Sequence, residues 1–135
     1  EVHDPTLPLI VTHTGVIGVK DHWRNIDDDQ IRAIADSGGV AGIMFQTSFL
    51  RTRGKPDDAG LVVDHLEHVI DVGGEATAAL GSDYDGAIVP PPELRDGFLG
   101  FYRIVQRMLD RGWDEARIRR VLGENFIASF EALRP

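Results

Sequence analysis

The sequence has no cysteine, no long apolar run and no excess of positive charge. Without cysteine the chain cannot form disulfides, thiolate metal sites or a cysteine nucleophile, so histidines and carboxylates remain for metal binding or base catalysis. Lys and Arg number 14 against 22 Asp and Glu, which gives a net charge of -8. This balance argues against nucleic acid as a partner, because phosphate binding depends on basic side chains.

The apolar stretches are short. Leu9–Val11 and Val40–Phe45 are among the longest, far below the roughly 20 residues that cross a bilayer, so no membrane segment is expected. No signal peptide is recognisable at Glu1, and the compartment stays open with the cytoplasm favoured. Seven arginines lie between residues 103 and 134 among acidic residues, and we expect them on solvated helix faces.

Three apolar segments bounded by glycine or proline predict β-strands. They are Leu7–Thr12, Val40–Phe45 and Ala76–Leu80. His13 and Thr14 are expected to begin the loop after the first strand, and the turn at residues 81–86 follows the third.

Apolar residues at helical spacing fill most of the remaining sequence. A helix at about 27–37 is expected to begin with a capping box formed by Asp27 and Gln30. Further helices are predicted at 60–72, 94–109 and 114–121, and a last apolar face has Phe126, Ile127, Phe130 and Leu133.

Strands that alternate with helices predict an α/β fold with a parallel sheet. Three strands are too few to close a barrel, and a (β/α)8 barrel of the TIM type needs about 250 residues. The 135 residues therefore predict one domain, residues 1–135, that is part of a barrel and a fragment of a longer chain.

Three polar side chains lie at or after predicted strand ends, where parallel α/β folds have their active sites. His13 follows the first predicted strand, Asp83 follows the third, and Arg24 comes eleven residues after His13. The carboxyl ends of parallel strands meet at one edge of the sheet, so a metal ligand, a carboxylate and an anion clamp are candidates for one site. Taken singly, the three residues equally fit a strand-end imidazole, a turn residue and a surface arginine.

Several segments together resemble the carboxyl-terminal half of the renal or membrane dipeptidase family. They are Thr12-His13-Thr14, Arg24-Asn25-Ile26-Asp27-Asp28, Asp64-His65-Leu66-Glu67-His68-Val69, Gly81-Ser82-Asp83-Tyr84-Asp85-Gly86, Arg111-Gly112-Trp113 and Gly123-Glu124-Asn125-Phe126. Their order and approximate spacing also match the family, and the match covers nearly the whole chain.

The resemblance implies an amidohydrolase-type (β/α)8 barrel, of which this chain supplies about strands six to eight. It implies hydrolysis of dipeptides with two zinc ions, in which His13 is a zinc ligand and Arg24 grips the substrate carboxylate. Asp83 is implied to contact the substrate and the attacking water, as the catalytic carboxylate. The family's other zinc ligands, a His-x-Asp pair, a bridging Glu and another His, lie upstream, so the chain alone is expected to hold an incomplete site.

Two other interpretations remain. The chain could be a non-catalytic half-barrel that associates with a second copy, or with the missing amino-terminal half, through its open sheet. It could also belong to a related amidohydrolase that acts on another amide or a lactam. The helix that carries Asp64, His65, Glu67 and His68 is expected on the barrel exterior, so these residues are interpreted as packing residues and not as a metal cluster. Trp113 is likewise expected to be a packing anchor.

Overall fold

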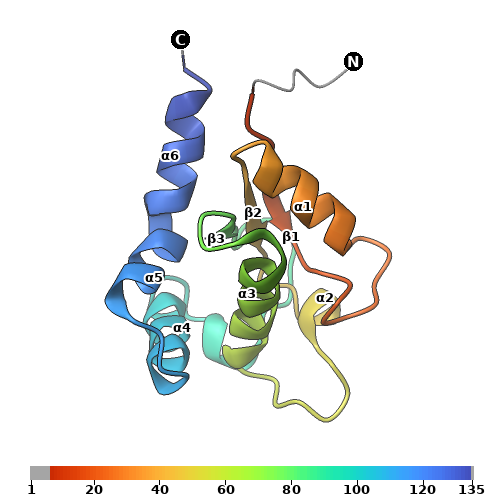
Figure 1. Cartoon of the computed structure of the whole chain (residues 1–135). Coiled ribbons are helices and arrows are strands. Elements are labelled where there is room, and N and C mark those ends of the chain that lie inside the picture. Colours follow the sequence, from red (N-terminus) through yellow and green to blue (C-terminus); the bar gives the residue numbers. More distant parts are fainter. Residues whose placement is uncertain (1–6, 135) are drawn as a thin grey trace.

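The computed structural model describes residues 7–134, in which three parallel strands form one sheet (Figure 1). The strands are β1 (Ile10–Thr14), β2 (Val40–Ile43) and β3 (Ala78–Leu80), side by side in that order. In the register Ile10 pairs with Val40 and Gly42 with Ala79. The predicted parallel α/β fold is therefore present.

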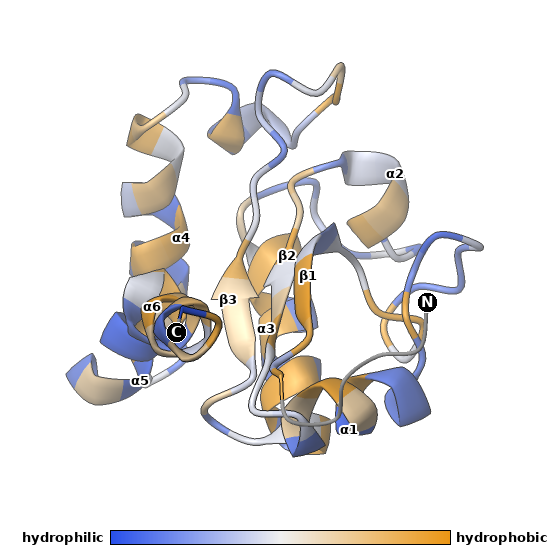
Figure 2. Cartoon of the chain, turned by 90° about the horizontal axis from the view of Figure 1, so that it is seen from above, coloured by the Kyte–Doolittle hydropathy of each residue, from blue (hydrophilic) through white to orange (hydrophobic). Residues whose placement is uncertain are grey.

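One face of the sheet is covered by α1 (Asp28–Asp36) and α3 (Gly60–Gly73), which also pack against each other. The fully buried side chains of Ile31, Ile43 and Leu66 belong to the core between these layers. Figure 2 shows the apolar residues of α3 beside the strands. Helix α1 begins with the predicted capping box, because Asp27 and Gln30 each accept a hydrogen bond from the other's backbone N–H.

The opposite face of the sheet carries Ile10, Thr12, Val40, Gly42 and Ala79, which line a cavity of about 220 Å³ together with Phe126. The backbones approach closely here, since a Cβ added at Gly42 would lie 2.5 Å from the carbonyl oxygen of Thr12. Glycine at this position therefore lets β1 and β2 keep their separation.

The carboxyl-terminal part of the described chain is helical. It consists of a 3-10 turn η1 (Pro92–Leu94), α4 (Leu99–Asp110), α5 (Glu115–Arg119), a π-type turn η2 (Arg120–Glu124) and α6 (Asn125–Ala132). The side-chain amide of Asn125 donates to the carbonyl oxygens of Glu75 and Ala78, and so ties the start of α6 to β3. None of the helices in residues 7–134 has the length and apolar composition to cross a membrane.

Two predicted boundaries are wrong for identifiable reasons, and one short helix was not predicted. The first strand extends to Thr14 because an irregularity in its pairing keeps His13 and Thr14 in the ladder. The helix predicted at 94–109 is interrupted at Gly97, whose φ of 59° is left-handed, and α4 begins only at Leu99. The short helix α2 (Thr47–Leu50) has too few residues to show a periodicity.

Two of the arginines expected on solvated faces form ion pairs with acidic residues of other elements. Arg111 bridges two carboxylates of α3, at 2.8 Å from Asp64 and 2.7 Å from Glu67, and Arg107 lies 2.9 Å from Glu93. Their acidic partners are distant in sequence, so charge spacing along one helix does not reveal these pairs.

Candidate functional site

The segments that follow the three strands meet at the carboxyl edge of the sheet. The Met44 N–H donates to the carbonyl of Thr14 at 2.9 Å, and the Phe45 N–H donates to the carbonyl of Ser82 at 3.2 Å. The backbone beside His13 and the backbone beside Asp83 are thus both bonded to the segment after β2. This is the edge at which parallel α/β folds bind their ligands.

His13 stands in an irregular part of β1. Val11 pairs with Ala41 and Thr14 with Ile43, so Thr12 and His13 together face the single residue Gly42. An extra residue of this kind re-aims side chains, and here both Thr12 and His13 are exposed. The Thr12 hydroxyl lies 2.8 Å from His13 Nδ1, so one ring nitrogen is engaged, and the other, Nε2, has no hydrogen-bond partner among residues 7–134.

Arg24 lies on the loop that follows β1. The Thr14 hydroxyl reaches the Arg24 carbonyl oxygen at 3.4 Å, which brings this loop back to the strand end. The guanidinium carbon lies 5.7 Å from the Trp23 ring centre and 5.8 Å from the Phe49 ring centre, within the range of cation–π contact. No carboxylate within residues 7–134 pairs with the Arg24 side chain, which is exposed. The guanidinium can therefore receive an external anion.

Asp83 occupies the turn after β3 in a left-handed conformation, with φ of 58°. Asp83 and Ala87 are the two non-glycine residues with positive φ in the described chain. Asp tolerates this region better than most residues, and such conformations concentrate at functional sites. The Gly86 N–H donates to the Asp83 carbonyl, and a Cβ at Gly86 would collide with the Asp83 carboxylate. The turn thus needs glycine at 86 for Asp83 to keep this position.

The structure brings the three sequence-predicted residues to one edge without direct contacts between their side chains. Since β2 separates β1 from β3, the carboxyl end of β1, where His13 lies, and the end of β3 that precedes Asp83 are roughly 10 Å apart. Within residues 7–134 no group of three or more His, Cys, Asp or Glu side chains is arranged to hold a metal ion.

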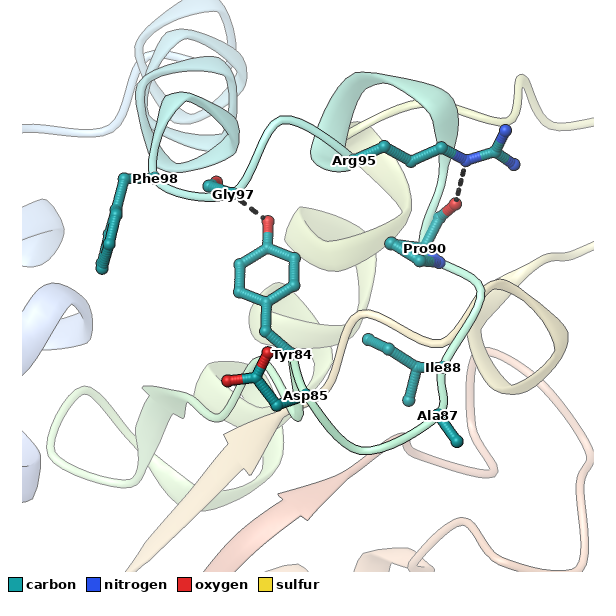
Figure 3. A pocket seen from close by; sticks show the side chains of 8 residues that line it. All are labelled: Tyr84, Asp85, Ala87, Ile88, Pro90, Arg95, Gly97 and Phe98. Atoms are coloured by element: carbon teal, nitrogen blue, oxygen red, sulfur yellow. Dashed lines mark hydrogen bonds between the residues drawn. The ribbon is translucent and has the colours of Figure 1, made fainter.

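A cavity of about 520 Å³ lies beside Asp83, and sequence reasoning missed it. Figure 3 shows its lining, which is Tyr84, Asp85, Ala87, Ile88, Pro90, Arg95, Gly97 and Phe98. The Tyr84 hydroxyl donates to the carbonyl of Leu94 at 2.6 Å and lies 3.2 Å from that of Gly97, and burial raises its pKa. The hydroxyl is thereby kept as a donor that fixes the cavity wall. The run Pro90-Pro91-Pro92 was the available signal for an irregular loop here.

The histidines of α3 have structural partners, as predicted. His65 is fully buried, and His68 Nε2 lies 2.7 Å from the Asp28 carboxylate. Asp64 and Glu67 are engaged by Arg111. Trp113 is 6% exposed and donates from Nε1 to Glu67, which confirms its packing role.

Known proteins are similar to this chain in sequence and in fold. The family model described as membrane dipeptidase (peptidase family M19) matches residues 4–133. A Klebsiella pneumoniae protein described as an uncharacterized protein in the pqqA 5' region is 39% identical over 128 residues, which are 93% of this chain and 46% of that protein.

Two solved structures have closely similar folds. A metallo peptidase from Rhodobacter sphaeroides, liganded with a phosphinate mimic of the dipeptide L-Ala-D-Ala, superposes with a TM-score of 0.85 at 34% identity, covering 95% of this chain and 37% of that chain. A metallo peptidase of family M19 described as dipeptidase AC gives 0.83 at 34% identity, covering 94% and 38%.

The chain thus spans less than half the length of these relatives, and the prediction that its sheet corresponds to part of a (β/α)8 barrel is confirmed. The family model covers nearly the whole sequence, and a relative above 30% identity covers it as well. The chain belongs to the membrane dipeptidase family, peptidase family M19.

Proposed function

We propose that the protein takes part in metal-dependent hydrolysis of dipeptides, at a site that residues outside this chain complete. The observation that carries the proposal is that the end of β1 with His13, the loop with Arg24 and the turn with Asp83 meet at the carboxyl edge of the sheet, in a member of this family. The similar Rhodobacter structure holds a dipeptide mimic, which supports a dipeptide as the substrate class.

A catalytic zinc takes about three protein ligands, and residues 7–134 contain no group of three His, Cys, Asp or Glu side chains placed to hold a metal ion. The described residues therefore do not fit a zinc site by themselves. We assign His13 as one ligand of the two-zinc site implied by the family, through Nε2 when Nδ1 donates to Thr12.

Arg24 is proposed to bind the terminal carboxylate of the dipeptide. A planar guanidinium can donate two parallel hydrogen bonds to a carboxylate. The ring of Phe49 lies close to the Arg24 guanidinium. The contact between Arg24 and the substrate carboxylate would hold the scissile carbonyl in one position relative to the strand ends.

Asp83 is proposed to act on protons. Its carboxylate accepts a proton from the water whose oxygen attacks the scissile carbonyl carbon, and passes the proton to the amine nitrogen as the carbon–nitrogen bond breaks. Among residues 7–134 no side chain neutralises this carboxylate, which leaves it available as an acceptor.

The test is release of free amino acids from a dipeptide panel by the intact protein that contains this chain, with and without a chelator. Loss of the charge-assisted bonds in Arg24→Ala is expected to lower kcat/KM by about 100-fold, mainly through KM. Arg120→Ala, at an exposed position of η2, serves as the control. Activity on a lactam or another amide, with none on dipeptides, would favour the related amidohydrolase instead.

A self-associating half-barrel is the second candidate, and the exposed apolar residues of η2 and α6 favour it. Phe126, Ile127 and Phe130 are 42%, 54% and 41% exposed. Apolar patches of this kind mark association sites. Sedimentation of the 135-residue chain as a dimer or larger, reversed by Ile127→Glu, together with inactivity of the intact protein, would support this candidate over the enzyme.

A further inference from the structure

Residues 15–26, here called the Arg24 loop, form a closed unit at the end of β1. The Ile26 N–H donates to the Gly15 carbonyl at 3.1 Å, and the Ile17 N–H donates to the Ile26 carbonyl at 2.8 Å. The ends of the loop are therefore joined by backbone hydrogen bonds. The position of its tip, including Arg24, depends on what holds the interior of the loop.

His65 of α3 is the first interior support. Its Nδ1 accepts a hydrogen bond from the Val16 N–H at 2.9 Å, and its Nε2 lies 3.1 Å from the Leu50 carbonyl. Because Nδ1 accepts, the ring proton is on Nε2 and is donated to Leu50. The fully buried ring thus joins the Arg24 loop to the end of α2.

Asn25 is the second support. It bonds to Phe49 of α2, the residue before Leu50. Its Nδ2 donates to the carbonyls of Lys20 and Phe49, each at 2.9 Å, and the residue is 5% exposed. Its Oδ1 lies so close to Gly15 that a Cβ there would be 2.5 Å away. The Thr52 hydroxyl adds a bond to the Val19 carbonyl at 3.1 Å.

These supports converge on the residue whose ring lies against Arg24. Asn25 fixes the backbone of Phe49, and the Phe49 ring lies 4.1 Å from the His22 ring and 5.8 Å from the Arg24 guanidinium carbon. Loss of the Asn25 amide would free both the loop and the aromatic ring that orients the guanidinium. A mobile arginine loses more side-chain entropy when it binds an anion, so its binding weakens.

We propose that Asn25 and His65 are positioning residues that hold the Arg24 loop against the end of α2, in the shape in which Arg24 binds a substrate carboxylate. The statement that Arg24 binds a substrate carboxylate rests on the function proposed above. The support of the loop by Asn25 and His65 does not, because it can be measured without any enzymatic activity.

The variants are chosen to separate positioning from general destabilisation. Asn25→Ala removes two amide donations inside the Arg24 loop. Asn125→Ala is the matched control, since Asn125 is 7% exposed and likewise donates to two backbone carbonyls, at the start of α6. His65→Gln is a second variant that keeps a polar side chain, and all are made in the intact protein.

The first readout is amide hydrogen exchange. In Asn25→Ala and His65→Gln the amides of Val16, Ile17 and Ile26 are expected to exchange at least about 10-fold faster than in the unchanged protein, while those of Val40 and Ala41 in β2 do not change. In Asn125→Ala the loop amides keep their protection. Unchanged loop protection in Asn25→Ala and His65→Gln would overturn the proposal, whether or not the protein hydrolyses dipeptides.

The second readout is discrimination between alanyl-alanine and alanyl-alanine amide, which lacks the terminal carboxylate. The ratio of their kcat/KM values is expected to fall about 10-fold in Asn25→Ala and His65→Gln, to stay unchanged in Asn125→Ala, and to fall no further when Asn25→Ala is added to Arg24→Ala. Equal losses on both substrates would overturn the positioning role. Inactivity of the unchanged protein would instead remove the proposed function and leave the exchange result to decide the loop support.

Discussion

At the scale of single residues, His65 is held in its neutral form by its surroundings. Burial lowers its pKa to about 4, and the backbone contact to Leu50 only partly opposes that effect. The tautomer that bonds both Val16 and Leu50 is neutral, and a second ring proton would remove the acceptor used by Val16. The hydrogen bonds and the desolvation therefore favour the same protonation state.

This predicts a stability that depends on pH. With a folded pKa below the unfolded value of 6.5, the unfolded chain binds more protons between pH 6.5 and 4, so stability falls as pH is lowered through that window. By about pH 4 the loss due to His65 is about 3 kcal/mol.

Urea denaturation at pH 7 and pH 4 measures this effect as the difference between the unchanged protein and His65→Gln, which cannot titrate. An identical loss of unfolding free energy in both proteins would show that His65 does not carry it.

At the scale of elements, the segments with strong local signals were predictable. Strand β2 and helix α3 follow from apolar patterns bounded by glycine, and α1 follows from its capping box. Features set by distant partners were not predictable. The His65 and Asn25 contacts to α2 span 15 and 24 residues, and the irregular pairing at Thr12 and His13 appears only when β1 is placed beside β2.

The capping box of α1 gives a prediction at this scale. Asp27→Ala removes the bond from the carboxylate to the Gln30 N–H and should lower the free energy of unfolding by about 1 kcal/mol, measured by urea denaturation. Asp36→Ala, at the other end of the same helix, is the control and should change it by less than about 0.5 kcal/mol, since an acidic residue there opposes the helix dipole. Equal effects of the two changes would contradict the capping role.

The candidate site was predictable in part for the same reason. The order of strands and loops placed the segments of His13, Arg24 and Asp83 at one edge, because that follows from parallel topology. The cavity beside Tyr84 depends on contacts between the turn after β3 and residues 94–98, which no local pattern encodes.

At the scale of the whole molecule, the chain is part of a larger barrel fold, since it spans 37–46% of its relatives. On the face of the sheet opposite α1 and α3, Val40 and Ala79 are buried, while Phe126 of α6 lines a cavity there and is 42% exposed. Core packing on the other face is complete enough for Ile31, Ile43 and Leu66 to be fully buried. The fold of this part therefore depends on its own core, while the proposed metal site would need ligands that residues 7–134 do not supply.

The absence of a three-ligand group in residues 7–134 predicts how the 135-residue chain binds zinc. The 135-residue chain alone should bind zinc weakly and below two equivalents, because residues 7–134 contain no ready-made group of three ligands. Equilibrium dialysis with metal analysis checks this, with His13→Ala expected to abolish the weak site and His68→Gln to leave it. Tight binding of two zinc ions by the 135-residue chain would contradict the account.

Asp83 is proposed to act in dipeptide hydrolysis, and the most direct test compares two neighbouring carboxylates in the intact protein. Asp83→Asn removes the proposed proton acceptor, whereas Asp85→Asn makes the same chemical change two residues away at an exposed position of the same turn. The account predicts that dipeptide hydrolysis falls by about 100-fold or more in Asp83→Asn and stays within about 3-fold in Asp85→Asn. Equal activity of the two variants, or no hydrolysis by the unchanged protein, would contradict it.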